Sequence, residues 1–504
     1  ASEYAEAIRP SRGVRQRAVS LPLRDRIRHY ACKAAAAGAH STMHAKNTAP
    51  RGVGTAAEAQ AFLDANPDIE AVQLVITDAC GVGRGKNVAR EELAALYGSG
   101  RNVAGSILGL DITGEDVEGT GLVWEVGDAD QCCRPVAGSL ARAPWLKRPS
   151  AQVLGTMYEL DGRPSQADPR HVLAGVVARC EAAGFTPVVA VELEFYLLER
   201  DAGGRLVPSA GMLSGERRGR IDAYGLGRLD DMSPLFDDLY ASAKALGLPV
   251  RTLMSEYAPG QFEITLEHRA DAMRAVDEAI LFKRAVRGVA ARHGRLACFM
   301  AKPFAERAGS GMHLHASLAD REGNNACAAE DPSGSPLLRH AIGGLRSTLA
   351  DGMAIYAPNA NSYRRFRSMS YAPVAVTWGV NNRSVSLRVP AGPPASRHVE
   401  HRMAGADANP YLVAALVLGG MLHGIHNQLD PGPPVQGNGY AQSQQGTLPT
   451  QWHAALEAAA SSVFLRDTLG SGFLDVFLAI KRQEAEKFGA LVSDRDYEWY
   501  LDTA

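Results

Sequence analysis

The stretch Val188-Val-Ala-Val-Glu-Leu-Glu-Phe-Tyr-Leu-Leu198 decides the fold of this chain. Its β-branched and aromatic residues predict a buried strand. Side chains alternate between the two faces of a strand, so Glu192 and Glu194 point to the same side. Two carboxylates on one buried face repel each other and lose hydration, which costs several kcal/mol for each ion. A divalent cation bound between them would compensate for this cost; an edge strand with one face in water is the alternative.

The same alternation of polar and apolar residues recurs in other predicted strands. The segment 311–318 places three polar side chains on one face: His313, His315 and Ser317. The segment 399–403 pairs Glu400 with Arg402 in the same way. In the segment 255–266, Pro259-Gly260 can reverse the chain and let Glu256 and Glu263 converge.

These segments together predict a curved antiparallel sheet whose concave face is a charged cavity; a set of solvated strand faces is the alternative. The five carboxylates and His313 would then need cations. Carboxylate oxygens with an occasional imidazole suit Mg²⁺ or Mn²⁺ rather than a cysteine-rich zinc site. Arginines nearby suit a polyanion, most simply the phosphates of ATP during phosphoryl transfer. They are Arg365, Arg383 and Arg388.

The composition is that of an ordinary soluble protein. The chain has 504 residues, 46% of them hydrophobic and 21% charged, and a net charge of −2. The length predicts two or more domains, and the balanced charge argues against nucleic acid as the main partner. No run of 18 apolar residues occurs, so no membrane span is expected, and 411–422 is interpreted as a buried helix. The seven scattered cysteines indicate free thiols in a reducing compartment.

Three regions are expected along the chain. Residues 1–50 form a basic extension that we expect to be disordered, with Met43 as a plausible true start. Residues 51–147 form a small unit with a helix at 55–66, and 148–504 form a larger one. Later helices are predicted at 271–293, 410–425, 451–469 and 472–488, and strands near 297–301, 374–380, 384–389 and 398–403. Isolated histidines are interpreted as surface or helix residues: His171, His268 and His453.

From about residue 55 to the end, the chain resembles the glutamine synthetase superfamily. The motifs that carry the resemblance are ELEFYL, EYAPGQFEI, FMAKPF, GSGMHLHASL, NSYRRF, NNRSVSLR and VEHRMAGADANPYL. The resemblance implies an α+β fold with a small N-terminal β-grasp domain, followed by a large catalytic domain whose curved antiparallel sheet is flanked by helices. It also implies a cytoplasmic homo-oligomeric ring of ten or twelve subunits with active sites between neighbours. The sequences of these motifs are similar to those of the γ-glutamylpolyamine synthetase branch.

The resemblance implies roles for individual residues and at least two Mg²⁺ or Mn²⁺ ions in each active site. The first metal would be held by Glu194, Glu256 and Glu263, and the second by Glu192, His313 and Glu400. The nucleotide would contact His315, Ser317, Arg388 and Arg397. Arg383 would stabilise the transferred phosphoryl group, and Glu256 would act next to the amine. The glutamate site would use Arg365, Arg402 and Gly309.

Three departures from the family pattern concern the substrates. Asp111 matches an aspartate of the ammonium loop contributed by the neighbouring subunit, but Gly114 replaces the last serine of that loop. Tyr371 stands where a mobile glutamate would close over the substrate, and His398 replaces a nucleotide-site arginine. The first two changes fit an amine larger than ammonia. The predicted reaction is ATP-dependent ligation of the glutamate γ-carboxylate to a polyamine or small monoamine through γ-glutamyl phosphate. The alternatives are an ordinary glutamine synthetase and a catalytically silent scaffold.

Overall fold

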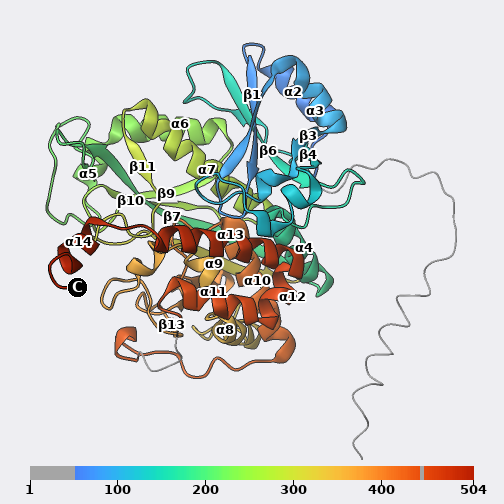
Figure 1. Cartoon of the computed structure of the whole chain (residues 1–504). Helices are drawn as coiled ribbons and strands as arrows, with labels where there is room; N and C mark the ends of the chain where they lie inside the picture. Colours follow the sequence, from blue (N-terminus) through green and yellow to red (C-terminus); the bar gives the residue numbers. More distant parts are fainter. Residues whose placement is uncertain (1–51, 443–447) are drawn as a thin grey trace, which may run out of the picture. The chain divides into compact units, whose positions relative to one another are not determined.

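The computed structural model describes residues 52–442 and 448–504 (Figure 1). The expected basic extension, Met43 and Cys32 lie outside the described residues, so those expectations stay predictions. The six described cysteines are all free thiols, as expected. Within the described ranges, no helix combines the length and the hydropathy that a membrane-spanning segment requires.

The first sheet has six strands in the order β2-β1-β6-β4-β3, with β5 paired to β6. The strands are β1 (Ala71–Thr77), β2 (Gly83–Ala89), β3 (Arg101–Ala104), β4 (Asp130–Pro135), β5 (Ala141–Arg142) and β6 (Ser150–Tyr158). The pairing of β1 with β6 is parallel, and the others are antiparallel. Helices α2 (Ala56–Ala65) and α3 (Leu93–Ser99) belong to the same part of the chain as this sheet. Because β6 begins after residue 147, the sheet continues beyond the predicted domain boundary, and the division at 147/148 stays a prediction.

The second sheet has nine strands in the order β13-β14-β15-β12-β7-β10-β9, with β8 and β11 also paired to β7. The strands are β7 (Thr186–Arg200), β8 (Leu206–Pro208), β9 (Val250–Ser255), β10 (Gln261–Leu266), β11 (Leu296–Cys298), β12 (Met312–Ala319), β13 (Trp378–Val380), β14 (Leu387–Val389) and β15 (Val399–His401). All pairs are antiparallel except β13 with β14. The expected mixed fold, with a curled antiparallel sheet flanked by helices, is confirmed (Figure 1).

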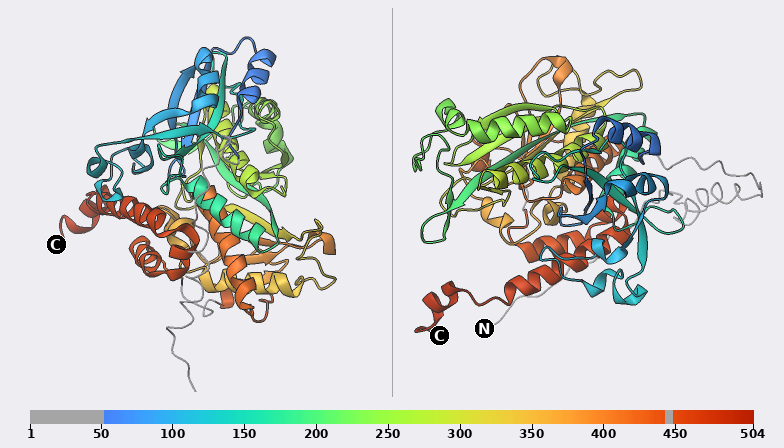
Figure 2. Two further views of the ribbon diagram at one scale, coloured as in Figure 1. Left: turned by 90° about the vertical axis from the view of Figure 1, so that its right-hand side faces the viewer. Right: turned by 90° about the horizontal axis from the view of Figure 1, so that it is seen from above.

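Helices cover the second sheet and build the core behind it (Figure 2). The helices of this part of the chain are α4 (Pro169–Ala182), α5 (Leu226–Asp231), α6 (Ser233–Ala245), α7 (Ala272–Arg292), α8 (Pro336–Thr348), α9 (Met353–Tyr356), α10 (Pro410–Asn427), α11 (Trp452–Ser461), α12 (Val463–Leu469), α13 (Ser471–Gly489) and α14 (Asp494–Tyr500). The last, α14, has no buried residue and projects at the C-terminal end (Figure 2). Side chains of Asp168, Asp271 and Asn409 cap α4, α7 and α10 by accepting backbone N–H bonds. The run 411–422 is a buried helix, as predicted.

Three predicted strands and one predicted helix differ from the structure. The strands expected at 374–380, 384–389 and 398–403 span only three residues each. The first of them, β13, ends at the turn formed by Asn381, whose φ is 49°. The single helix expected at 451–469 is broken at Ser462. The hydroxyl of Ser462 accepts a bond from the Leu465 N–H at 3.1 Å, so this residue ends α11 and begins α12.

Candidate active site

Strand register gathers the predicted acidic residues on one face of the second sheet. On β7, Glu192 lies opposite His313 of β12, and Glu194 lies opposite Glu263 of β10. Further along the sheet, Glu400 of β15 lies opposite His315 of β12 and Arg388 of β14. The alternate residues of β7, such as Leu193 and Phe195, are fully buried in the hydrophobic core. The single face predicted from the alternation is therefore present.

The segment 255–266 reverses direction as the sequence predicts. Strands β9 and β10 pair antiparallel, and the Glu256 N–H donates to the Gln261 carbonyl at 2.9 Å. Gly260 makes the reversal possible: its φ is 75°, and a Cβ there would lie 2.9 Å from the Pro208 side chain and 3.1 Å from the Leu197 carbonyl. The turn places Glu256 and Glu263 beside the two glutamates of β7.

Glu192 and Glu400 share two imidazoles. His313 Nδ1 lies 2.6 Å from Glu192 Oε1 and 3.6 Å from Glu400 Oε1. His315 Nε2 lies 3.6 Å from Glu192 Oε2. Glu192, His315 and Glu400 offer ligand atoms within 4.8 Å of one another. The predicted ligands Glu192, His313 and Glu400 are thus brought together, with His315 at the same place.

Glu194 accepts different hydrogen bonds from Glu192, although His313 Nε2 also lies 3.9 Å from Glu194 Oε1. One of its oxygens accepts bonds from the Gly311 N–H at 2.9 Å and from the Gln261 amide at 3.2 Å. Glu194 also lines a cavity of about 240 Å³. Seven of the predicted site residues line this cavity: Glu194, Glu256, Gly309, His313, Arg365, Tyr371 and Arg402.

Arginines compensate one part of the acidic face and leave the other part without counter-charge. Arg388 donates to Glu400 at 2.8 Å, and Arg402 also donates to Glu400. Burial would raise the pKa of Glu400, but Arg402 and the neighbouring histidines lower it to about 2. Among the described residues, Glu256 and Glu263 form no ion pair.

Both unpaired carboxyls have raised pKa values. Burial and the nearby Glu194 raise the pKa of Glu256 to about 7. Burial and three neighbouring glutamates raise the pKa of Glu263 to about 11. Crowded carboxylate oxygens that lack a basic partner are the ligand set that Mg²⁺ and Mn²⁺ prefer. The donor set therefore fits a hard divalent cation at Glu194, Glu256 and Glu263.

These pKa shifts predict how stability depends on pH and metal. Because the folded-state pKa of Glu256 exceeds its ordinary value of 4.5, the folded chain holds this proton more tightly than the unfolded chain. Its contribution to stability is then greatest below pH 4.5 and is lost as the pH rises through about 7. We expect Mg²⁺ to raise the unfolding temperature more at pH 8 than at pH 5.5, relative to chelated protein, because binding must displace the protons. Thermal unfolding at both pH values measures this. An equal rise in unfolding temperature at pH 8 and pH 5.5 would contradict the prediction. So would a Glu256→Gln variant in which the difference between the two pH values is as large as in the wild type.

The predicted glutamate-site arginines are buried at the cavity. Arg365 is 4% exposed and donates to the carbonyls of Met403 at 3.0 Å and Arg402 at 3.3 Å. Within the described part of the chain, Arg365 forms no ion pair, so its buried charge faces the cavity without a carboxylate partner. The Arg402 guanidinium also reaches the Tyr371 carbonyl at 3.5 Å, which ties the segment around Tyr371 to the cavity wall.

Nine of the predicted site residues do not line this cavity. Five of them belong to the acidic face described above, namely Glu192, Glu263, His315, Arg388 and Glu400. Four remain. Ser317 is buried on β12, on the same face as His315, and Arg397 donates to the Gly392 carbonyl at 2.7 Å. Arg383 lies exposed in the turn after β13, and its charge acts on Tyr224 together with that of Glu256. Arg383 therefore does not line the cavity, and its role at the site stays a prediction.

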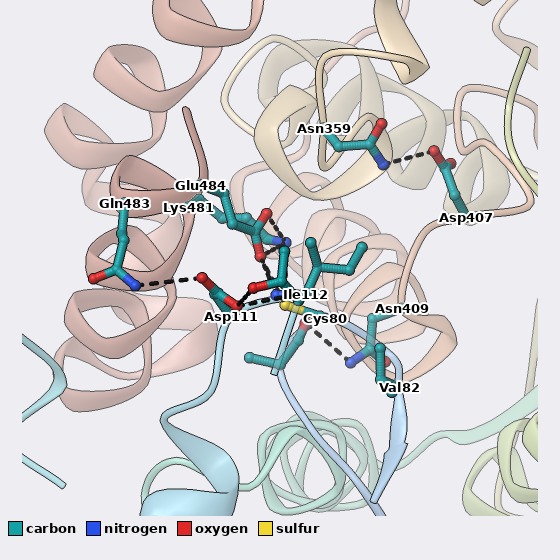
Figure 3. Close-up of polar contacts among 12 residues, drawn as sticks. Cys80, Val82, Asp111, Ile112, Asn359, Asp407, Asn409, Lys481, Gln483 and Glu484 are labelled. Carbon is teal, nitrogen blue, oxygen red and sulfur yellow. Dashed lines mark hydrogen bonds and ion pairs between the residues drawn. The ribbon is translucent and has the colours of Figure 1, made fainter. Parts of the chain in front are cut away.

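Asp111, the fourth, is held by other parts of its own chain (Figure 3). One carboxylate oxygen accepts the N–H groups of residues 113, 114 and 115, and the other contacts Lys487 at 2.5 Å and Gln483 at 3.3 Å on α13. Glu484 of the same helix accepts the Ile112 N–H at 2.9 Å. In Figure 3 the side chains of Gln483 and Glu484 point from α13 toward the loop that holds Asp111 and Ile112. Asp111 does not line the cavity of its own chain.

Sequence reasoning missed several residues at the cavity. Gln261 bridges Glu194 and the Gly309 carbonyl, with its amide 3.0 Å from that oxygen. Lys302 and Arg307 line the cavity, and Lys302 donates to the Arg307 carbonyl. Gln261 and Lys302 stand inside the motifs EYAPGQFEI and FMAKPF, which was the available signal. Arg307 lies in a loop with no periodicity that could have marked it.

The class of the protein follows from comparison of this fold and site with known families. The profile described as glutamine synthetase, catalytic domain, matches residues 166–500. The chain therefore belongs to the glutamine synthetase family, whose members depend on ATP and divalent metal ions. The expected family is confirmed.

Individual relatives include several amine ligases. Gamma-glutamylputrescine synthetase PuuA of Escherichia coli (strain K12) is 38% identical over 457 residues, covering 90% of this chain and 96% of the relative. Glutamate–isopropylamine ligase of Pseudomonas sp is 32% identical, covering 86% of this chain and 95% of the relative. Among solved structures, a GmaS/ADP complex has a TM-score of 0.76 at 27% identity, covering 88% of this chain and 99% of that chain.

Proposed function

We propose that this protein is an ATP-dependent glutamate–amine ligase that joins the γ-carboxylate of glutamate to a polyamine or small monoamine. The observation that carries the proposal is the cavity lined by Glu194, Glu256 and the buried Arg365, which forms no ion pair with any described residue. A carboxylate substrate can pair with Arg365 there, next to a carboxylate set that suits a divalent cation. The relatives that are named as ligases of putrescine and isopropylamine support an organic amine.

The proposed reaction has two steps. The γ-phosphoryl group of ATP moves to a γ-carboxylate oxygen of glutamate, which gives ADP and γ-glutamyl phosphate. The amine nitrogen then attacks the acyl carbon, phosphate leaves with that oxygen, and the amine loses a proton. Bound divalent cations would neutralise phosphate and carboxylate charge at Glu192, Glu194, Glu256, Glu263, His313 and Glu400.

The remaining residues are proposed to orient the substrates. Arg365 and Arg402 hold glutamate beside Gly309, and Glu256 accepts the proton that the incoming amine loses. The nucleotide lies at the β12–β15 end of the sheet, near His315, Ser317, Arg388 and Arg397, and Arg383 closes over the transferred group. Asp111 is proposed to complete the amine site of a neighbouring subunit in a homo-oligomeric ring of ten or twelve chains. A native mass measurement tests the ring, and the cytoplasmic location stays a prediction.

An amine panel tests the proposed function. With ATP, glutamate and Mg²⁺, we expect kcat/KM for at least one of putrescine, ethanolamine, isopropylamine or methylamine to exceed that for ammonia by about tenfold or more, or roughly 1.4 kcal/mol. Phosphate release and mass spectrometry of the amide provide the readouts. Ammonia turnover that equals that of every organic amine would indicate an ordinary glutamine synthetase. Failure to bind ATP or release phosphate would indicate a silent scaffold.

Tyr371 should affect the amine more than the other substrates. Its ring is 62% exposed at the cavity, and its φ of 58° holds it in a conformation that side chains rarely adopt. If the ring covers an ammonium group, Tyr371→Ala should raise KM for the organic amine about 5- to 30-fold, for a contact worth about 1–2 kcal/mol. Tyr371→Phe keeps the ring and should stay near the wild type. An equal rise in the KM for ammonia, or a rise confined to the KM for glutamate, would contradict this role.

The structure also explains why a serine cannot simply be restored at residue 114. Gly114 has a φ of 94°, and an added Cβ would lie 3.3 Å from the Arg84 guanidinium. A serine there would strain the loop around Asp111 in addition to changing its chemistry. Gly114→Ser is therefore a poor test of ammonia use, and the amine panel is the better one.

A further inference from the structure

Three histidines from separate elements of the second sheet and its connections meet at one place. His315 lies on β12, His398 directly precedes β15, and His268 follows β10. The ring centroids of His315 and His398 are 5.1 Å apart, and His268 lies 5.1 Å from His398 and 5.7 Å from His315. One nitrogen of each ring lies within 4.8 Å of the other two. His268 is exposed, as its sequence interpretation predicts, but it is not isolated.

The inner pair has the spacing of two ligands on one ion. His315 Nδ1 and His398 Nε2 face each other at 2.9 Å. Two imidazole nitrogens that each lie about 2.0–2.1 Å from one ion are separated by roughly 3 to 3.4 Å, depending on the bond angle. The pair therefore needs only a few tenths of an ångström of movement, well within the freedom of side chains, to bind a metal ion between the rings.

The outer nitrogens of the pair face acceptors. His398 Nδ1 lies 2.7 Å from the Ser396 carbonyl, so this nitrogen carries the proton and Nε2 offers its lone pair. His315 Nε2 is buried without a hydrogen bond to any described residue, and it lies 3.6 Å from a Glu192 oxygen. Metal-binding histidines typically direct their second nitrogen to a backbone carbonyl or a carboxylate in this way.

We propose that His268, His315 and His398 bind one divalent transition-metal ion of the zinc type. Three imidazoles with an exposed third member leave a coordination position open to water. Imidazole nitrogen favours Zn²⁺, Co²⁺ or Ni²⁺ over Mg²⁺, which prefers oxygen. This ion is separate from the cations proposed at the carboxylates, and the proposal does not rest on the proposed function.

The alternative arrangement is a chain of hydrogen-bonded imidazoles that holds no metal. In that case His315 would donate its Nδ1 hydrogen to His398 Nε2, and His268 would contribute only a ring contact. The two arrangements differ in one measurable respect. A hydrogen-bonded chain leaves metal content independent of His268, whereas a metal site requires it.

Metal content of the full-length protein tests the proposal. Chelator-stripped protein is dialysed against micromolar Zn²⁺ with millimolar Mg²⁺, and zinc per chain is measured by mass spectrometry. We expect His268→Gln and His398→Gln to retain one zinc fewer than the wild type, or to bind it about 10- to 100-fold more weakly. His426→Gln removes an exposed imidazole from the last turn of α10 and should match the wild type.

Cobalt provides a second readout that does not depend on counting. Co²⁺ bound by three imidazoles should give visible d–d absorption in the wild type and in His426→Gln, and this absorption should be lost in His268→Gln. Zinc content in His268→Gln equal to the wild type would overturn the proposal. An equal loss in His426→Gln, or complete removal of zinc by Mg²⁺, would also overturn it. Because His268 is exposed, its variant should fold even if His398→Gln does not.

Discussion

Alanine at Glu194 and alanine at Glu192 should damage different halves of the reaction. Glu194→Ala should lower kcat/KM for glutamate and amine by about a thousandfold, or roughly 4 kcal/mol. Glu192→Ala should produce a loss of similar size in kcat/KM for ATP. The KM for ATP should change much less in Glu194→Ala. The KM values for glutamate and amine should change much less in Glu192→Ala.

The surroundings of the two carboxylates give the reason. Glu194 lines the cavity that also contains Arg365 and is fixed by the Gly311 N–H and the Gln261 amide. Glu192 contacts His313 and points a second oxygen toward His315, at the end of the sheet where Arg388 and Glu400 lie. The two residues share one strand face, and His313 also lies 3.9 Å from Glu194. We propose that each nevertheless serves a different set of ligands.

Initial rates with one substrate varied at a time distinguish the two halves. Thr265→Ala provides a control, because Thr265 lies opposite Glu192 in the strand register without adding a carboxylate. This control should retain activity within a few-fold of the wild type. Indistinguishable effects of the two glutamate variants on ATP, glutamate and amine kinetics would contradict the division.

Loss of Glu400 should cost more stability than loss of any other acidic residue of the site. The Glu400 side chain is 2% exposed and neutralises Arg388 and Arg402, which are 11% and 6% exposed. Glu400→Ala would leave two buried guanidinium groups without a carboxylate, a change that costs about 3–5 kcal/mol. Chemical denaturation of the chelated protein measures this loss.

Glu263→Gln is the matched comparison. The pKa of Glu263 is raised to about 11 by burial and by its glutamate neighbours, so this carboxyl is already protonated at neutral pH. A neutral amide of similar shape should change the stability of the chelated protein by less than about 1 kcal/mol. It should nevertheless weaken the Mg²⁺-dependent stabilisation. Equal destabilisation by both variants would show that the arginine pairing does not set the effect.

Alternation along single strands was sufficient to predict the acidic face. The period of two in 188–198 and in 311–318 fixes which side chains share a face, and the antiparallel pairing of β7 with β12 then sets His313 opposite Glu192. The reversal at Pro259-Gly260 was also predictable, because a glycine tolerates the positive φ of that turn. Family resemblance added the division into two metal sites.

Contacts between distant segments could not be predicted in this way. The contact of His268 with His398 was not predictable from local pattern, since 130 residues separate the two histidines. The attachment of Asp111 to Lys487 depends on how α13 packs against the first part of the chain. Arg365 was predicted as a substrate residue, but its lack of a carboxylate partner emerges only from the packing of residues 402 and 403 against it.

Transfer of oxygen from glutamate to phosphate tests the central claim most directly. Glutamate labelled with oxygen-18 in its γ-carboxylate is incubated with ATP, Mg²⁺ and the preferred amine, and the released phosphate is analysed by mass spectrometry. If γ-glutamyl phosphate forms, each phosphate released with an amide carries one labelled oxygen. Amide formation accompanied by unlabelled phosphate would contradict the proposed ligase mechanism.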